Sequence, residues 1–234
     1  MGTLKEDLFA RLRQEGAALM GVADLTGLVT GPWATGVSVA VPVPPDIVKD
    51  LEISPTAAYH RAYHTLNEKL NHIVEAGAAF LASRGYRARA NTTHTVRQDE
   101  HWNTPLPHKT VATRAGLGWI GKNCLLVTPE YGGAIRLSSL VTDAPLPPDP
   151  AVTESKCGPC RRCVEACPAQ ALTGALWQAG VPREALFQPD VCEKTQRARM
   201  KAATGIDTDL CGLCFAVCPY TKRYRKRTER GDEA

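Results

Sequence analysis

The sequence lacks any long apolar segment, and this absence excludes a helix that crosses a membrane. None of its hydrophobic runs approaches the ~20 apolar residues that such a helix needs. The N-terminal stretch MGTLKEDLFARLRQEG lacks an apolar core and twin arginines, and its acids and bases are interspersed. No export signal is therefore visible, and we expect a cytoplasmic protein.

The chain also lacks a strong charge bias. Its 28 Lys and Arg residues face 24 Asp and Glu residues, so the formal net charge is only +4. This small excess gives no ground for expecting a nucleic-acid-binding protein. The hydrophobic content of 44% supports a folded core, and 234 residues suffice for one large domain or for one domain plus a small module.

Nine cysteines stand out against this background, and eight of them lie between Cys157 and Cys218. In a reducing compartment such a set argues against disulfides and for metal binding. The first run, CGPCRRCVEACP, has the C-x2-C-x2-C-x3-C-P spacing that holds [4Fe–4S] clusters in bacterial ferredoxins. A second run, CGLCFAVCP, ends in the same Cys-Pro pair, and each proline fixes the turn by which the chain leaves its cluster.

The spacing divides the eight cysteines between two clusters. In such motifs the three closely spaced cysteines bind one cluster, and the fourth binds the other. We assign to cluster 1 Cys157, Cys160, Cys163 and Cys218, and to cluster 2 Cys167, Cys192, Cys211 and Cys214.

Cys192 is the irregular member of this set. A regular ferredoxin would place this ligand shortly before Cys211, where the chain has Thr208, so we interpret residues 193–210 as an insertion within the second run. The alternative is that Cys192 is an ordinary thiol and that cluster 2 is incomplete or has three irons. Zinc is a weaker alternative, because zinc sites pair their cysteines in twos. Cys124 lies outside the runs and is expected to be a small buried residue.

The remaining sequence predicts an α+β domain. Thr3 and Glu6 form a capping box before a helix, Ser54-Pro55 starts a long helix to about Ser83, and a shorter helix is expected from about His108. Strands are predicted at 37–43, 86–91, 124–128 and 134–142, the last two joined as a hairpin. We expect an α+β domain at 1–143, a proline-rich linker at 144–150, a double-cluster domain at 151–221 and a basic tail at 222–234.

A long polar loop is predicted between residues 92 and 107, and such loops are uncommon unless they are functional. Its Asp99 and His101 are candidate proton donors if a substrate is reduced. Other candidates in or beside the loop are His94, Glu100 and His108. The alternative is that the loop histidines are merely exposed. His60 and His64, four residues apart on the long helix, form a candidate metal pair that lacks a third ligand.

The octet at residues 116–123, GLGWIGKN, matches the dinucleotide motif G-x-G-x-x-G and nearly matches the P-loop. Both motifs need a strand before and a helix after, because the helix N-terminus binds the phosphate. Here the predicted order is reversed, and Asn123 replaces the hydroxyl residue of the P-loop. Two interpretations remain: a glycine-rich turn, or a turn whose backbone approaches a ligand other than a nucleotide.

The run HKTVATRAGLGWIGKNCLL, with the predicted hairpin and the cysteine runs behind it, resembles the epoxyqueuosine reductase family, which is corrinoid-dependent and related to reductive dehalogenases. The resemblance implies a nitroreductase-like α/β sandwich domain followed by a bacterial-ferredoxin-like double [4Fe–4S] domain. It further implies base-off cobalamin, held between these domains without a protein ligand to cobalt. The implied cofactor-binding residues are Gly116, Gly118, Trp119, Gly121, Lys122 and Asn123.

Two departures from the family pattern bear on the substrate. Full-length members carry a helical-repeat domain after the clusters that helps to hold tRNA, whereas this chain stops at Ala234, so we expect a short form. Members also carry an acidic proton donor before the octet. Matching Pro105 and Lys109 without gaps puts Trp102 at that position, with Asp99 and His101 nearby but out of register. We therefore do not expect tRNA to be bound as in full-length members.

Together these features predict an oxidoreductase that passes low-potential electrons through two [4Fe–4S] clusters to a cobalamin, which reduces a small substrate. The expected electron donor is a ferredoxin or a flavodoxin. The alternative is a ferredoxin-type electron-transfer protein or partner subunit without an organic cofactor, and a flavin in the α+β domain is a third option. The basic tail is either a surface for RNA or an acidic donor, or a solvated C-terminus.

Overall fold

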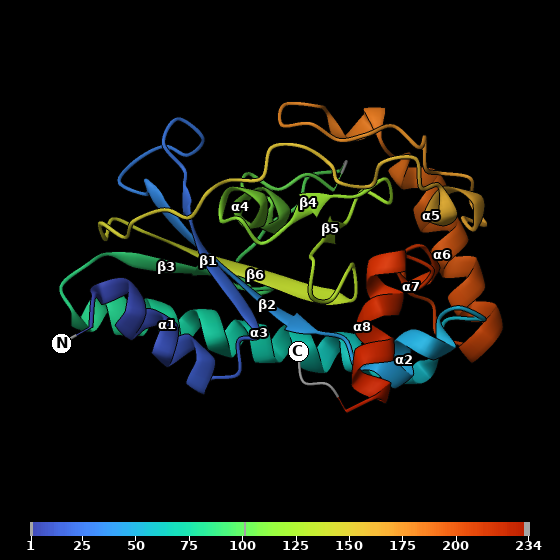
Figure 1. Ribbon diagram of the computed structural model, residues 1–234, viewed down its shortest axis with the longest axis horizontal. Helices are drawn as coiled ribbons and strands as arrows, with labels where there is room; N and C mark the ends of the chain where they lie inside the picture. The colour runs from blue at the N-terminus through green and yellow to red at the C-terminus, as the bar shows by residue number, and fades with distance from the viewer. Residues whose placement is uncertain (1, 101, 232–234) are drawn as a thin grey trace. The chain divides into compact units, whose positions relative to one another are not determined.

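Two compact units interleave along the chain. The computed structural model describes residues 2–100 and 102–231 (Figure 1). The first unit, here called the sheet unit, comprises the residues up to Val41, Thr65–Leu117 and Arg136–Val152. The second, called the cysteine unit, comprises Pro42–His64, Gly118–Ile135 and the residues from Thr153 onward. The cysteine runs therefore share their unit with two earlier segments of the chain, Pro42–His64 and Gly118–Ile135.

A four-stranded sheet forms the centre of the sheet unit. Its strand order is β1 (Leu19–Asp24), β2 (Thr35–Pro42), β6 (Ile135–Thr142) and β3 (Ala88–Asn91). The outer pairs are antiparallel, with Leu19 opposite Ala40 and Ala88 opposite Thr142. The predicted α+β class is confirmed.

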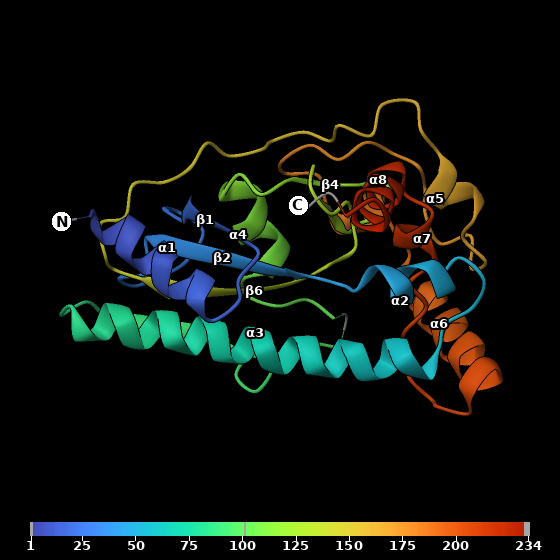
Figure 2. The same ribbon diagram turned by 60° about the horizontal axis from the view of Figure 1, so that its bottom comes forward.

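Helices α1 (Leu4–Gln14) and α3 (Ala57–Ser83) pack on one face of this sheet, and α4 (His108–Arg114) lies on the other (Figure 2). The predicted capping box is present, because Thr3 and Glu6 each accept a hydrogen bond from the other's backbone N–H. The core buries the strand residues that alternate toward α1 and α3. Its principal members are Leu8, Leu12, Val22, Val37, Val39, Val41, Leu70, Ile73, Val74, Leu81 and Leu140.

Gly77 lets α3 approach the sheet closely. A Cβ on Gly77 would lie 2.8 Å from Cδ2 of Leu140 and 2.9 Å from Cδ2 of Leu12. On the opposite face, Gly21 has the same function toward α4, because a Cβ there would lie 2.3 Å from the carbonyl oxygen of Ala115. Glycine at these two points sets how closely each helix layer packs on the sheet.

The cysteine unit is built from short helices and one small sheet. The first turns of α3 join α2 (Pro45–Asp50), and β4 (Trp119–Ile120) pairs antiparallel with β5 (Leu126–Val127). The residues from Thr153 onward contribute the remaining described helices. These are α5 (Arg162–Glu165), η1 (Arg183–Ala185), α6 (Pro189–Thr204), α7 (Leu213–Ala216) and α8 (Pro219–Glu229).

Helix α8 occupies the predicted basic tail and is docked within its unit. Tyr224 is buried, and its hydroxyl donates to the carbonyl oxygen of Val43 at 3.1 Å. Lys222 and Arg225 both pair with Glu52. The alternative of a solvated C-terminus is therefore wrong for the docked side of α8, whereas Arg223, Lys226 and Glu229 are exposed.

Two further expectations, the hairpin and the single domain boundary, differ from the structure. The predicted hairpin is wrong, because β5 pairs with β4 in a separate sheet from β6. Residues 193–210, interpreted as an insertion, lie largely in α6, and that interpretation stays a prediction. Instead of one boundary near residues 144–150, the chain has interleaved units, with Arg136–Val152 in the sheet unit. Among the helices of the described residues, none has the length and apolarity needed to cross a membrane.

Candidate metal centres

The first set of cysteines lines one cavity. Cys157 and Cys160 lie on a tight loop, Cys163 lies in α5, and Cys218 is the residue that caps the N-terminus of α8. Gly158, between the first two, has φ of +54°, a conformation that glycine adopts readily. The structure therefore brings together the four cysteines that the sequence assigned to cluster 1.

The same four thiols influence one another electrostatically. Burial raises the pKa of Cys163 to about 11, and the neighbouring Cys157, Cys218 and Cys160 raise it further. Burial also raises the pKa of Cys218, although the backbone N–H groups of Thr221 and Tyr220 donate to its sulfur and act in the opposite direction. A cationic metal centre would relieve this repulsion, because bound metal favours the thiolate form.

Lys122 of the octet reaches the loop of this first set. It is 6% exposed, and its Nζ donates to the carbonyl oxygens of Gly158 at 2.8 Å and Cys160 at 3.0 Å. Asn123 lines the same cavity, and its Oδ1 accepts from the backbone N–H of Leu125 at 3.2 Å. Two octet residues thus border the candidate cluster 1.

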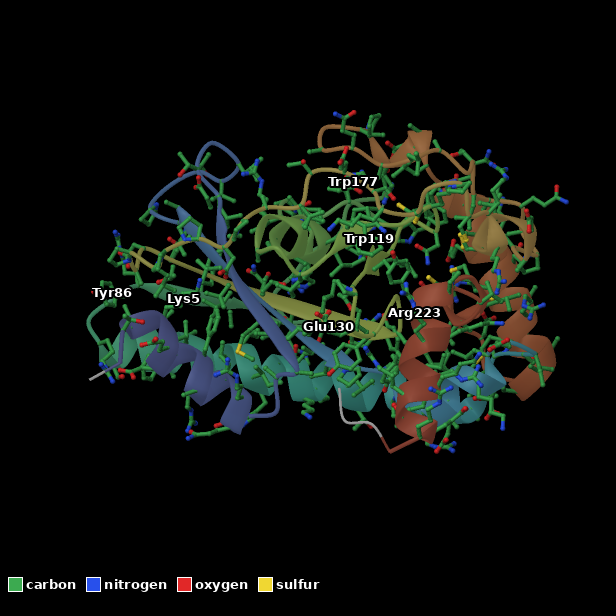
Figure 3. The ribbon with its side chains drawn as sticks, in the orientation of Figure 1. Lys5, Tyr86, Trp119, Glu130, Trp177 and Arg223 are labelled. Carbon is green, nitrogen blue, oxygen red and sulfur yellow. The ribbon has the colours of Figure 1, made fainter. Side chains whose placement is uncertain are left out.

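The second set gathers around α6 and α7. Cys167 follows α5, Cys192 lies inside α6, and Cys211 and Cys214 lie at α7. Figure 3 shows sulfur atoms grouped among α5, α6 and α7. The side-chain amide of Gln196 donates to Sγ of Cys192 at 3.0 Å.

Electrostatic coupling links Cys192 to this second set. Burial raises the pKa of Cys192 to about 11, and Cys167 and Cys211 raise it further, while the hydrogen bond from Gln196 lowers it. Burial likewise raises the pKa of Cys214, followed by the effects of Cys211 and Cys192. The structure therefore places Cys192 with the cysteines that need a fourth member, although its role as a ligand stays a prediction.

The first donor set consists of four cysteines around one cavity, which is the number and type of ligands that a [4Fe–4S] cluster takes. In the described part of the chain, no three His, Cys, Asp or Glu side chains converge as the ligands of one metal ion. The cavity lined by the first set measures about 40 Å³, whereas one water needs ~10–15 Å³. Thiolates spaced around such a cavity suit the cuboidal cluster that their sequence motif binds.

The octet glycines are explained by contacts within the protein. The helix-before-strand order is as predicted, since α4 precedes the octet and β4 lies within it. A Cβ on Gly118 would lie 2.1 Å from the carbonyl oxygen of Val127, and one on Gly121 would lie 2.8 Å from Cγ2 of Val127. Gly116, in the sheet unit, has φ of +75°, and its Cβ would lie 2.7 Å from the carbonyl oxygen of Pro150. These observations favour a glycine-rich turn that packs closely.

Trp119 carries an unsatisfied donor beside the first set. Its side chain is 1% exposed, and its Nε1 has no hydrogen-bond partner among the described residues. Trp119 is labelled in Figure 3. Its ring packs edge-on against Tyr220, which also lines the cysteine cavity, with ring centroids 4.9 Å apart. A buried N–H without a partner costs free energy, so this donor is an exception among buried polar groups.

Asp99, the described candidate proton donor, lies in a turn that Asn103 helps to shape. Asp99 accepts from the backbone N–H of Asn103 at 2.8 Å and from its side-chain amide at 3.3 Å. Trp102 has φ of +56° within this turn. His101 lies outside the described residues. Asp99 therefore has a structural function in shaping the loop, and its catalytic function stays a prediction.

The sequence indicated His108 as a candidate proton donor, but not the buried polar group that it forms in the sheet unit with Ser139 and Asn91. Nδ1 of His108 lies 2.9 Å from Oγ of Ser139, which also accepts from the side-chain amide of Asn91 at 3.2 Å. Burial lowers the pKa of His108 to about 4, and the guanidinium of Arg136 adds to the effect. The available signal was the pair of serines in the middle of the apolar run that forms β6.

Comparison with known families agrees with the cysteine geometry. Residues 156–221 match the family described as a 4Fe-4S double cluster binding domain. The chain is therefore an iron–sulfur protein with two [4Fe–4S] clusters.

Curated relatives specify the family further. The chain is 30% identical over 176 residues to the epoxyqueuosine reductase of Pseudomonas aeruginosa, a match covering 75% of this chain and 45% of the relative. It is 33% identical over 177 residues to that of Bacillus subtilis, covering 71% and 40%. The chain belongs to the epoxyqueuosine reductase-like family. Its match spans less than half the length of these relatives.

Solved structures show the same fold. An epoxyqueuosine reductase crystallised with an epoxyqueuosine-modified tRNA stem loop gives a TM-score of 0.62 at 22% identity, covering 94% of this chain and 65% of that one. A catabolic reductive dehalogenase gives a TM-score of 0.70 at 17% identity, covering 98% and 34%.

Proposed function

We propose that this chain is an iron–sulfur oxidoreductase that passes low-potential electrons through two [4Fe–4S] clusters to a corrinoid, which reduces a small substrate. The observation that carries the proposal is the cavity shared by the first cysteine set with Lys122 and Asn123 of the octet. This arrangement puts candidate cluster 1 beside the segment that the family resemblance associates with the cofactor. The names of the curated relatives support a reductase.

Support for a corrinoid comes from a structural neighbour and from Trp119. A reductive dehalogenase with a TM-score of 0.69 to this chain is described as B12-dependent. When bound, a corrinoid supplies a cobalt centre that accepts single electrons and acts on the substrate. In this chain the buried Nε1 of Trp119 would donate to a carboxamide at the corrinoid edge, and Lys122 and Asn123 would hold the cluster side of the site. The glycines of the octet would act by close packing.

Proton delivery in this proposal falls to the loop at residues 92–107. Asp99 is the described candidate, and His101 is the second candidate of the sequence. The carboxylate of Asp99 is held by Asn103, so a substrate would compete with these hydrogen bonds for its oxygens.

The proposed electron path indicates what kind of protein would donate electrons to this chain. We propose a ferredoxin or flavodoxin as the donor, since the clusters accept one electron at a time. One solved relative is described with a modified tRNA stem loop. For this chain we propose a smaller substrate instead, because Trp102 stands where the family places its acidic donor.

A second candidate function is an electron-transfer protein without an organic cofactor. The close packing at Gly118 and Gly121 favours it, because the chain's own atoms fill the space on both glycines. The two functions differ in whether the octet region binds a ligand at all.

Anaerobic reconstitution with iron, sulfide and hydroxocobalamin, followed by gel filtration, separates these two functions. The reductase proposal predicts a corrinoid spectrum that co-elutes with the protein at about one per chain, as for any one-site ligand at saturation. Trp119→Phe keeps an aromatic side chain but removes the N–H together with the five-membered ring that carries it, so it should weaken corrinoid retention while iron content stays unchanged. A fully loaded two-cluster protein that retains no corrinoid would favour the electron-transfer alternative.

A further inference from the structure

Lys122 is a buried cation whose contacts leave its charge without a protein counterion. Its side chain is 6% exposed, and its Nζ donates to two neutral carbonyl oxygens, those of Gly158 and Cys160. Among the described residues, no carboxylate pairs with it, although the cysteine unit contains ion pairs elsewhere. Buried charges are normally paired, because removing a charge from water without compensation is costly.

A [4Fe–4S] cluster held by the neighbouring cysteines would supply the missing negative charge. Lys122 lines the same cavity as Cys157, Cys160, Cys163 and Cys218. A [4Fe–4S] cluster with four thiolate ligands is a net anion, and reduction adds one further negative charge. An ammonium fixed beside it in a low-dielectric site interacts with it more strongly than a solvated one would.

We propose that Lys122 is the counterion of cluster 1 and the residue that positions its loop. Two of its three N–H donors fix the carbonyls of the Cys157–Cys160 turn, and its charge stabilises the reduced cluster over the oxidised one. The midpoint potential of cluster 1 is therefore higher than the thiolate set alone would give, because local charge is one of the determinants of such potentials. This inference rests on the proposed assignment of the four cysteines to one cluster.

Two substitutions separate the functions of the ammonium. Lys122→Met removes both the charge and the hydrogen bonds to the loop. Lys122→Gln keeps amide donors for the two carbonyls but removes the charge. Lys156→Met is the matched control, since Lys156 is an exposed lysine that lies over the ring of Trp119, 5.9 Å from its centroid, and bears the same charge near the same cluster.

The test is a potentiometric titration of the reconstituted protein, followed by electron paramagnetic resonance. With Lys122→Gln, the reduced-to-oxidised ratio of cluster 1 at a fixed potential should fall at least tenfold, which is a shift of about −59 mV for one electron. Cluster 2 should titrate as in the wild type, and iron should remain at about eight per chain. Lys156→Met should change neither midpoint by a comparable amount.

Several outcomes would overturn the proposal. Wild-type midpoints in both Lys122→Gln and Lys122→Met would show that the charge does not act on cluster 1. An equal shift with Lys156→Met would show a general surface effect. If Lys122→Met no longer binds cluster 1, the midpoint potential of cluster 1 in Lys122→Gln alone tests the proposal. An iron content of about four in the wild type would instead contradict the two-cluster assignment itself, independently of Lys122.

Discussion

The side-chain amide of Gln196 lies 3.0 Å from Sγ of Cys192 and donates a hydrogen bond to it. The two residues stand one turn apart on α6, so helix geometry fixes the contact. The neighbouring thiols of Cys167 and Cys211 raise the pKa of the same Cys192 thiol. The irregular cysteine is therefore electrostatically coupled to the second set.

Gln196→Leu tests whether this hydrogen bond acts on a cluster ligand. Hydrogen bonds to ligand sulfur stabilise the more negative, reduced state, so their loss should move the midpoint potential of cluster 2 to lower values. The potential of cluster 1 should not change. Gln188→Leu, at the exposed start of the same helix, is the control. Identical midpoints for cluster 2 in Gln196→Leu and the wild type would contradict a ligand function for Cys192.

Gly118→Ala tests whether the octet glycines act through packing. An added Cβ would lie 2.1 Å from the carbonyl oxygen of Val127, so β4 and β5 would have to separate. We expect a loss of about 1–3 kcal/mol or more in stability, as for other overpacked sites. Thermal unfolding with and without cobalamin is the measurement. Gly158→Ala is the comparison, because nothing lies within 4 Å of its Cβ position and only its φ is unfavourable.

A Gly118→Ala protein as stable as the wild type, but defective only in corrinoid binding, would contradict the packing function. It would instead indicate that Gly118 faces a ligand.

His108 predicts a pH dependence of stability. Its pKa in the folded protein is about 4, below the ordinary 6.5, so the unfolded chain takes up a proton in this interval and the folded chain does not. Stability from this group is therefore complete above pH 6.5 and is lost as the pH falls toward 4. The full difference is at most about 3 kcal/mol. The melting temperature, measured at several pH values between 8 and 5.5, should decrease once the pH is below 6.5.

The same series with His108→Asn should show a shallower fall, because the side chain that binds the extra proton on unfolding is absent. His72→Gln, on the exposed face of α3, controls for the loss of a histidine. A wild-type slope in His108→Asn would assign the pH dependence to other groups.

Local sequence patterns predicted much of the fold because they depend on neighbouring residues. The Thr3–Glu6 capping box and the apolar spacing of α3 both describe contacts within one helix. The pairing of β5 was mispredicted because it has a strand on either side at a short sequence separation, and the structure pairs it with β4, where Gly118 closely approaches Val127. Likewise, nothing local indicated that Tyr224 would dock on Val43 and make a helix of the predicted tail.

In the candidate site too, the features set by local sequence were predicted and those set by distant contacts were not. Cysteine spacing identified both sets because the ligands of each loop are set by short-range geometry. Lys122 was singled out for a cofactor, but its contacts with Gly158 and Cys160 link segments far apart in the chain. The polar group of His108, Ser139 and Asn91 was missed for the same reason, since it joins a helix to two strands.

The most direct test of the account is the iron content of Cys192→Ser after anaerobic reconstitution, with Cys124→Ser as the matched control. Cys124 is buried and lies outside both sets, so its variant should bind as much iron as the wild type. We predict about eight irons per chain in the wild type and about four in Cys192→Ser, with the signal of cluster 1 retained. An unchanged content of about eight irons in Cys192→Ser would show that Cys192 is not a ligand and would contradict the division of the cysteines into two complete sets.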